Sequence, residues 1–489
     1  MIMVQPLYTA EQAREIDRQA IQGLSISGYD LMQRAGLVLF EQLKQVSAYK
    51  EAVHIFCGAG NNAGDGYVLA KLLLESGILP HVYALSAGAD LTGDALSAFK
   101  AYSQLGSVNN VLPTELSSGV IVDALIGTGL NKPLMGNYLD AVKLINRAQL
   151  TTLAVDVPSG LNADTGYVQD DAVRADKTVS FIGLKRGLYT ADGPSYSGEI
   201  ILDDLSVPQA LLTSQPAEAE LLSLAALKKN HQPREKNTHK GDFGHVLMVG
   251  GDHGFSGAIR LAGEAALRAG AGLVSIATRE EHAAFISMAR PELMSHGISG
   301  RSAFKQLATR STVLAVGPGL GQTPWAYELF EAALDLKKPM VVDADGLNLL
   351  AKEPRKNDNW VLTPHPAEAA RLLACTTQQV QCDRFTAVKN LQQQYGGVVV
   401  LKGSGSLICG GGSVYVCAAG NPGMASGGMG DVLTGIIAAL LAQGNSLIEA
   451  AKLAVMVHSV AADRAVISGE KGLLASDLMP YIKELINEY

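Results

Sequence analysis

The sequence predicts an α/β protein of two domains, each built on a mostly parallel sheet. Short apolar segments alternate with helical patterns in two successive series, and this alternation is typical of βαβ units. A stretch rich in proline and charged residues, at 205–240, separates the two series. At 489 residues the chain also exceeds what one hydrophobic core usually organises. We therefore place the boundary near residue 222, which gives domains at 1–222 and 223–489.

The strands are predicted from apolar or β-branched segments bounded by Gly, Pro, Asp or Asn. In the first series these segments are Ala52–Cys57, His81–Leu85, Val120–Leu125, Thr152–Val157 and Thr178–Phe181. In the second they are His245–Gly250, Leu273–Ala277, Thr312–Val316, Met340–Asp343, Trp360–Thr363, Val398–Lys402 and Ser413–Cys417. Helical patterns follow at 66–76, at 94–105 and from Asp431 almost to the carboxyl terminus. Thr9 and Gln12 have the spacing of a helix capping box.

Composition excludes several classes of protein. The net charge of −8, with no basic block to offset it, argues against a general nucleic-acid binder. The amino terminus lacks the pattern of an export signal, and the apolar stretch 432–441 is too short to span a bilayer. The five cysteines form no CxxC pair, which is typical of buried thiols in a reducing compartment. We expect a cytoplasmic protein.

A glycine-rich segment, Asn421–Asp431, precedes the predicted helix 432–441. Its four glycines, Gly423, Gly427, Gly428 and Gly430, free the backbone to turn N–H groups towards one point. The helix that follows adds its partial positive charge there, as in many phosphate sites. Asp431 is electrostatically wrong for binding an anion but suits a base that removes a proton from an attacking hydroxyl. The alternative is a flexible turn with Asp431 as an ordinary N-cap.

Two other segments after predicted strands suit the same site. Lys402–Ser406 offers a cation, two hydroxyls and free amides for nucleotide phosphates, and could equally be a polar hairpin turn. Thr363–Glu368 places His365 between two prolines, which would present its side chain or simply stiffen a turn. The chain has no Walker lysine motif, which excludes P-loop chemistry.

In the first half, an asparagine-rich loop follows the first strand at 57–66. It has the glycine spacing of a dinucleotide-binding turn, but the next strand ends without the acid that would bind a ribose. Asp123 and Asp156 lie at the ends of two later strands. Because the carboxyl ends of parallel strands meet at one crevice, these acids indicate a site there, although capping of turns is the simpler alternative.

The second half resembles the ADP-dependent NAD(P)H-hydrate dehydratase family, which is similar in fold to the ribokinase-like vitamin kinases. The resemblance rests on five motifs in order, at 250–258, 317–321, 363–368, 402–406 and 421–431. It implies that Asp431 is the catalytic base and that the hydrate is bound by Ala258, Gly319, His365 and Asp431. It also implies that ADP, the phosphoryl donor with Mg²⁺, is bound by Lys402, Gly403, Ser404, Gly405, Ser406 and Gly430.

The first half resembles the NAD(P)H-hydrate epimerase family, and a fusion of the two is itself typical of such proteins. This implies a Rossmann-like domain in which Asp156 is catalytic at the nicotinamide ring. By the same resemblance, K⁺ would be held by Asn62, Asp123 and Ser159, an all-oxygen set that suits a hard cation. The hydrated dinucleotide would contact Asn61, Asn62, Ala63, Gly64, Asp65, Gly127, Thr128, Gly129, Leu130, Asn131, Lys132, Pro133 and Asp156. Ala63 departs from the glycine that is frequent there in the family.

Together the resemblances imply repair of hydrated NADH and NADPH. The first domain would interconvert the R and S epimers, and the second would dehydrate the S form with ADP, giving NAD(P)H, AMP and phosphate. We expect a homo-oligomer with no nucleic-acid or membrane partner. The alternative is a ribokinase-like vitamin or sugar kinase with a non-catalytic N-terminal binding module.

Overall fold

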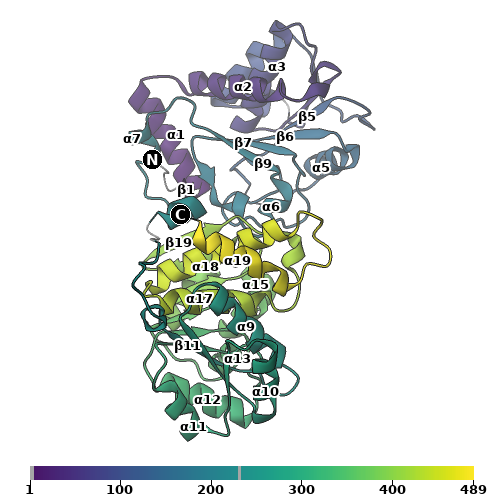
Figure 1. Cartoon of the computed structure of the whole chain (residues 1–489). Coiled ribbons are helices and arrows are strands. Elements are labelled where there is room, and N and C mark those ends of the chain that lie inside the picture. The colour runs from purple at the N-terminus through teal and green to yellow at the C-terminus, as the bar shows by residue number, and fades with distance from the viewer. Residues whose placement is uncertain (1–4, 87, 131, 230–232, 489) are drawn as a thin grey trace. The chain divides into compact units, whose positions relative to one another are not determined.

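The computed structural model describes residues 5–86, 88–130, 132–229 and 233–488 (Figure 1). The chain divides into two compact units between Ala219 and Glu220. We call residues 6–219 the N-terminal unit and residues 220–489 the C-terminal unit. Both contain a largely parallel sheet with helices, so the predicted α/β class is confirmed.

The N-terminal unit contains a parallel sheet in the order β4-β3-β2-β5-β6-β7-β9. All five segments predicted as strands in this half are strands of the sheet. The edge strands β4 and β9, and the parallel pairing of β1 with β8, were not predicted. The strands are β1 Gln5–Tyr8, β2 Val53–Cys57, β3 His81–Ala84, β4 Val108–Asn109, β5 Val120–Ala124, β6 Thr151–Val155, β7 Lys177–Phe181, β8 Leu184–Lys185 and β9 Glu199–Asp203.

Helices cover both faces of this sheet, which explains why its strands are continuously apolar. Val53 and Ile55 of β2 belong to a core shared with residues of α1 to α4, while Phe56 belongs to a second core with residues of α5. α1 begins after the Thr9–Gln12 capping box, as predicted. The helices are α1 Ala10–Leu24, α2 Gly28–Leu43, α3 Asn61–Glu75, α4 Gly93–Ser103, α5 Asn137–Ala148, α6 Gly193–Tyr196 and α7 Gln209–Leu212.

The sheet of the C-terminal unit has the order β13-β12-β11-β14-β15-β16-β17-β18-β19-β10. It is parallel from β13 to β17 and then continues as an antiparallel β17-β18-β19 meander. All seven predicted strands are present, and β10, β13 and β18 are additional. The strands are β10 Ala219–Leu221, β11 His245–Val249, β12 Leu273–Thr278, β13 Met294–Gly297, β14 Val313–Val316, β15 Met340–Val342, β16 Trp360–Leu362, β17 Val398–Leu401, β18 Ser406–Gly410 and β19 Ser413–Cys417.

The main core of the C-terminal unit lies between this sheet and α9, α17, α18 and α19. α17 is apolar on all sides because it is buried between α9, α18 and the sheet. The helices are α8 Leu224–Lys228, α9 Ser256–Arg268, α10 Glu280–Ala289, α11 Arg301–Ala308, α12 Pro324–Leu334, α13 Ala344–Lys352, α14 Pro366–Leu372, α15 Thr377–Cys382, α16 Arg384–Tyr395, α17 Met429–Ala442, α18 Leu447–Ala465 and α19 Met479–Asn487.

Two helices begin earlier than the sequence predicts, and both changes concern the candidate sites. α3 begins at Asn61 rather than at residue 66, so Asn61–Asp65 form its first turns instead of a loop. α17 begins at Met429 rather than at Val432, and its N-cap is Gly428 with a φ of 93°. Glycines disfavour helices in isolation, but here neighbouring elements approach so closely that larger residues would not fit. Asp431 is therefore not the N-cap.

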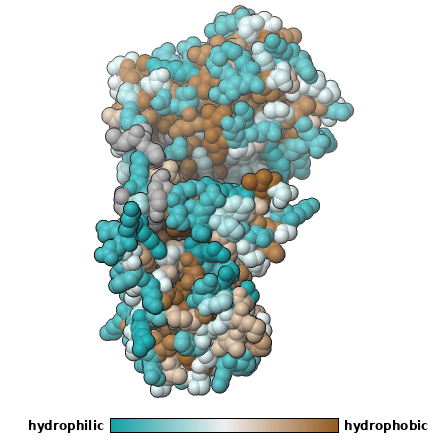
Figure 2. Space-filling view, in the orientation of Figure 1, coloured by the Kyte–Doolittle hydropathy of each residue, from teal (hydrophilic) through white to brown (hydrophobic). Residues whose placement is uncertain are grey.

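Hydrophilic and hydrophobic residues are interspersed on the face of each unit shown in Figure 2. Exposed apolar residues such as Leu79 and Ile467 lie singly along the chain, as is usual for protein surfaces. Within the described ranges, no helix combines the length and the apolar character needed to cross a membrane.

The contact between α17 and α9 leaves no room for a side chain at Gly435. A Cβ atom there would lie 2.1 Å from the carbonyl oxygen of Ala262. We expect Gly435→Ala to lower the free energy of unfolding of the C-terminal unit by about 1–3 kcal/mol, because the helices must move apart. Tryptophan fluorescence in urea measures this, since both tryptophans, Trp325 and Trp360, lie in that unit. Gly257→Ala, with open space around the new methyl group, should cause no loss.

Candidate active sites

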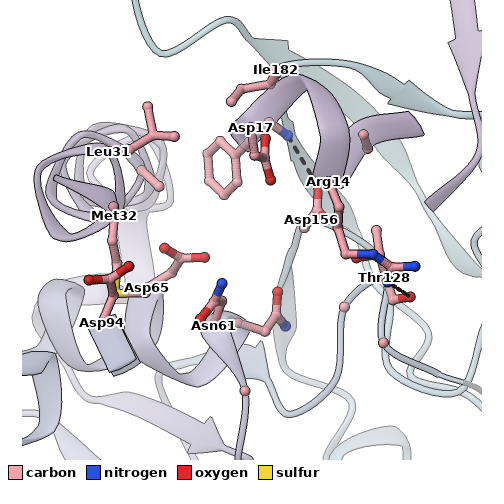
Figure 3. A pocket seen from close by; sticks show the side chains of 18 of the residues that line it. Arg14, Asp17, Leu31, Met32, Asn61, Asp65, Asp94, Thr128, Asp156 and Ile182 are labelled. Atoms are coloured by element: carbon pink, nitrogen blue, oxygen red, sulfur yellow. Dashed lines mark hydrogen bonds between the residues drawn. The ribbon is translucent and has the colours of Figure 1, made fainter. Parts of the chain in front are cut away.

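A cavity of about 490 Å³ lies in the N-terminal unit, at the carboxyl ends of its central strands (Figure 3). Its walls come from α1, α2, the starts of α3 and α4, the loop after β5, the turn after β6 and the segment from β7 to β8. Of the residues predicted to bind the dinucleotide, those that line it are Asn61, Asn62, Asp65, Gly127, Thr128, Gly129 and Asp156. The topology therefore brings together the asparagine turn and the two strand ends, as expected for a parallel sheet.

The other described residues of the predicted set are not part of the cavity lining. Ala63 is fully buried, and a Cβ at Gly64 would lie 2.5 Å from the side chain of Met32 on α2, so both pack into the protein core. Leu130, Lys132 and Pro133 continue the loop beyond the lining residues, and Asn131 lies outside the described residues. Direct contact of these residues with a dinucleotide stays a prediction.

Asp156 forms a buried ion pair with Lys185, a residue that the sequence did not indicate. The Lys185 ammonium group is almost fully buried and also donates to the carbonyl oxygen of Phe181, at 2.9 Å. Asp156 has a φ of 65°, an unfavourable backbone conformation for a residue with a side chain. Its carboxylate accepts a bond from the Phe181 amide at 3.2 Å. These contacts hold Asp156 at the edge of the cavity in one orientation.

Three further carboxyl groups line the same space: Asp17 from α1, Asp65 from α3 and Asp94 from α4 (Figure 3). Burial raises the pKa of Asp17 to about 6, an effect that Lys185 opposes and Asp156 reinforces. Burial, together with the charges of Asp156 and Asp17, raises the pKa of Asp65 well above its usual value. Lys185 thus interacts with three of these acids, Asp156, Asp17 and Asp65, and it is paired only with Asp156.

Asp123 and Ser159 form a hydrogen-bonded pair near the cavity, and Asn62 lines the cavity with its side-chain oxygen against Gly127. The Asp123 carboxylate accepts bonds from the Ser159 hydroxyl at 2.6 Å and the Ser159 amide at 2.8 Å. Burial raises the pKa of Asp123 to about 6 although these bonds lower it. The Asn62 amide nitrogen is buried without a hydrogen-bond partner among the described residues. Asp123 has no paired cation in the part of the chain that the structure describes, and carboxylate, hydroxyl and amide oxygens are donors that fit an alkali-metal ion.

In the C-terminal unit, Asp431 lies in the first turn of α17, beside a buried group of charges. Burial and the nearby carboxylates Asp343 and Glu368 raise the pKa of Asp431 to about 7, while Lys402 lowers it. Gly430 packs directly on this group, since a Cβ there would lie 3.1 Å from the Lys402 ammonium nitrogen. Asp431 is thus a carboxyl group that titrates near neutrality at the positive end of a buried helix.

Lys402 is paired with Asp343, which directly follows the strand β15. The ammonium nitrogen lies 2.8 Å from a carboxylate oxygen of Asp343, whose other donors are the hydroxyls of Thr363 and Thr434. Burial alone would raise the pKa of Asp343, but Lys402 and these hydroxyls hold it below its usual value. Lys402 consequently neutralises mainly Asp343, and it stabilises the ionised form of Asp431 less.

His365 is the N-cap of α14, and Glu368 completes a capping box with it. The Nδ1 atom of His365 accepts a bond from the Ala367 amide at 3.1 Å, while burial and Lys402 lower the pKa of the ring. The Glu368 carboxylate lies 4.0 Å from the Lys402 ammonium nitrogen. The two prolines therefore present a neutral imidazole at the edge of the charged group.

Segment 402–406 is the turn between β17 and β18, so the hairpin alternative is confirmed for its backbone. The Arg384 side chain, which is 1% exposed, stabilises this turn. Its guanidinium group donates to the carbonyl oxygens of Leu401, Lys402 and Gly405. A Cβ at Gly403 would lie 2.7 Å from this guanidinium group. These contacts fix the conformation of the turn, and with it the position of Lys402 beside Asp431.

Ala258 and Gly319, which were both predicted to bind the hydrate, lie next to each other. A Cβ at Gly319 would lie 3.3 Å from the Cβ of Ala258, at the start of α9. One turn further along α9, Leu261 packs against Gly428, the N-cap of α17. The structure therefore brings the motifs at 250–258, 317–321 and 421–431 to the same end of the sheet.

Comparison with known proteins agrees with both sites. Residues 28–187 match the family described as YjeF-related protein N-terminus, and residues 246–484 match NAD(P)H-hydrate dehydratase. The bifunctional NAD(P)H-hydrate repair enzyme Nnr of Coxiella burnetii is 46% identical, over 98% of this chain and 99% of its own. That of Escherichia coli is 41% identical, over 98% of this chain and 94% of its own. The chain belongs to the bifunctional NAD(P)H-hydrate repair enzymes.

A solved structure supports the fold of the C-terminal unit of this repair enzyme. It is a ribokinase-like superfamily protein of Enterococcus faecalis, 28% identical with a TM-score of 0.51, covering 54% of this chain and 94% of its own. The ribokinase-like expectation is confirmed.

The buried pair of Lys402 and Asp343 provides a stability test of the dehydratase unit. Lys402→Met should lower the free energy of unfolding by about 3–5 kcal/mol, because it leaves the Asp343 charge buried without a cation. Adding Asp343→Asn to Lys402→Met should recover part of that loss. Urea unfolding followed by tryptophan fluorescence measures the coupling, and strictly additive effects of the two substitutions would contradict the pairing.

Proposed function

We propose that the C-terminal unit dehydrates the S epimer of hydrated NADH or NADPH at the expense of ADP. The observation that carries this is Asp431, a carboxyl group titrating near neutrality in the first turn of α17, beside the Lys402 ammonium group. A base with such a pKa is ionised often enough to accept a proton and basic enough to take one. The relatives' printed names supply the substrate class.

In the proposed reaction Asp431 takes the proton of the ring hydroxyl, whose oxygen attacks the terminal phosphoryl group of ADP. The bond from that phosphorus to the bridging oxygen breaks, and AMP leaves. The nitrogen lone pair of the ring then expels phosphate from the carbon, and loss of a proton from the adjacent carbon gives NAD(P)H. Amides at the start of α17 stabilise the charge of the transferred group. Ala258, Gly319 and His365 contact the hydrate in this proposal.

Segment 402–406 and Gly430 hold the nucleotide in this proposal, with Lys402 nearest the phosphates. Ser404 and Ser406 supply hydroxyls, and Gly403 and Gly405 supply backbone groups, Gly403 from an exposed position and Gly405 from a buried one. We expect Mg²⁺ to be bound through the ADP phosphates, because no cluster of three or more His, Cys, Asp or Glu in the described ranges is arranged to hold a metal.

We propose that the N-terminal unit interconverts the R and S epimers, with the nicotinamide ring in the cavity beside Asp156. The carbon that bears the hydroxyl adjoins the ring nitrogen, so opening and reclosing that bond needs only proton transfer. Asp156 holds or accepts the hydroxyl proton, and Lys185 stabilises its charge. K⁺ would be held by Asn62, Asp123 and Ser159 and would neutralise the Asp123 carboxylate. We take residues 1–222 as the epimerase domain and 223–489 as the dehydratase domain.

The kinase alternative is not favoured, because relatives that match both units are named bifunctional NAD(P)H-hydrate repair enzymes. A homo-oligomer and a cytoplasmic location stay predictions, as does the absence of a nucleic-acid or membrane partner.

Loss of the base should abolish dehydration. Asp431→Asn should lower kcat/KM for recovery of dihydronicotinamide absorbance by roughly 10²–10⁴-fold. In the unaltered protein kcat/KM should fall as the pH drops through about 7, because protonated Asp431 no longer accepts a proton. The variant should retain epimerisation by the N-terminal unit, and unaltered tryptophan fluorescence is the folding control for the C-terminal unit. A kinase would instead accumulate a stable phosphorylated product from the hydrate.

Potassium should stabilise the N-terminal unit. KCl should raise its calorimetric unfolding midpoint relative to LiCl at the same ionic strength, because a bound cation neutralises Asp123. Asp123→Asn should remove this difference, whereas Asp140→Asn, which removes an exposed acid from α5, should preserve it. Equal midpoints in the two salts for the unaltered protein would exclude the site.

A further inference from the structure

The epimerase cavity contains more acidic groups than its proposed reaction has used so far. Asp17 lies on α1, outside every motif that carries the resemblance to the epimerase family, and it lines the cavity with Asp156 and Asp65. The neighbouring acid on the same helix, Glu15, is instead paired with Arg18 at 2.6 Å on the exposed side. The charged groups that act on Asp17 are Lys185, Asp156, Arg14 and Asp65, and Asp94 of α4 lines the same cavity.

Asp156 and Asp17 differ in their interaction with Lys185. Its ammonium group is bonded to Asp156, the Ser180 hydroxyl and the Phe181 carbonyl oxygen. All three hydrogens of the ammonium group are therefore used, and Asp17 forms no ion pair with it in the described structure. Two carboxyl groups whose surroundings differ in this way can take opposite roles in proton transfer.

We propose that Asp17 is a second catalytic residue of the epimerase site, which gives a proton to the ring nitrogen while Asp156 takes one from the hydroxyl. This role rests on the proposed epimerase function. The two carboxyl groups reach the cavity from different elements, α1 and the turn after β6 (Figure 3). A ring bound between them can therefore exchange protons with one acid at its nitrogen and with the other at its hydroxyl.

The step balances without any other reactant. Asp156 accepts the hydroxyl proton, the oxygen forms a carbonyl, and the carbon–nitrogen bond breaks with its electron pair going to nitrogen. Asp17 protonates that nitrogen, and the ring-opened aldehyde turns about its neighbouring carbon–carbon bond. The nitrogen then attacks the other face of the carbonyl and returns its proton to Asp17, while Asp156 returns the proton to oxygen.

A group that must both give and take a proton works best with a pKa close to the working pH. Burial raises the pKa of Asp17 to about 6, with Asp156 adding to the effect and Lys185 and Arg14 opposing it. Arg14 also donates to the carbonyl oxygen of Thr128 at 3.5 Å, which ties α1 to the loop that lines the cavity. The opening step requires protonated Asp17, so the rate should decline as pH rises above about 6.

The test follows conversion of a single purified epimer of hydrated NADH into the other without ADP, after subtraction of the rate in buffer. Asp17→Asn should lower kcat by roughly 10²-fold and remove the decline at higher pH. Asp17→Glu should restore part of kcat, and the control Glu15→Gln should behave as the unaltered protein. Dehydration of the S epimer with ADP should be unchanged in every variant.

Epimerisation by Asp17→Asn at the unaltered rate and with the unaltered pH profile would overturn the role of Asp17. A change in KM alone would also overturn it, because it would make Asp17 a binding residue. An unaltered protein that does not epimerise would instead refute the proposed function of the N-terminal unit.

Discussion

A buried lysine can neutralise only one of several carboxylates around it, and this electrostatic constraint organises both candidate sites. In the C-terminal unit Lys402 pairs with Asp343, and Asp431 is left with a pKa of about 7. In the N-terminal unit Lys185 pairs with Asp156, and Asp17 is left with a pKa of about 6. Each unit thus combines a fixed ion pair with an acid that exchanges protons near neutral pH, as acid–base chemistry requires.

The two sheets create this situation in the same way. Parallel strands end at one edge, and the chain after each strand brings its polar groups to that edge. Asp343 directly follows β15 and Asp156 directly follows β6, while Lys402 directly follows β17. A helix then begins at the same edge, α3 in one unit and α17 in the other, with its free amides directed there. Desolvation by the surrounding helices makes the charges at these edges costly, so their pairing determines which acid remains protonated.

Much of this arrangement could be predicted from the sequence. The strands were visible because continuous apolar segments are typical of sheets covered on both faces, and Asp431 was visible because it follows four glycines. The early start of α17 was not visible, since Gly428 and Gly430 disfavour a helix until Leu261 packs on Gly428 and Lys402 packs on Gly430. β18 was missed because the antiparallel meander breaks the alternation of strand and helix.

The residues that the sequence did not reveal act through contacts between distant segments. Asp17 lies among Glu15 and Arg18, and this pattern is typical of a solvated helix face. Lys185 and Arg384 belong to no glycine-rich motif. Each contributes to a site only because the fold brings its side chain against the backbone of a neighbouring segment, at Phe181 and Leu401 respectively. For Lys185 and Arg384, complete burial of a charged side chain is the decisive signal, and burial depends on tertiary packing.

The pH dependence of dehydration by Asp343→Asn tests this account most directly. Removing the negative charge of Asp343 takes away a repulsion and releases Lys402 to Asp431, so the pKa of Asp431 should fall. We predict that the midpoint of the rise in kcat/KM with pH moves at least one pH unit lower than in the unaltered protein. An unchanged midpoint, measured on folded protein with its tryptophan fluorescence intact, would contradict the claim that one shared lysine controls the proton-transfer group.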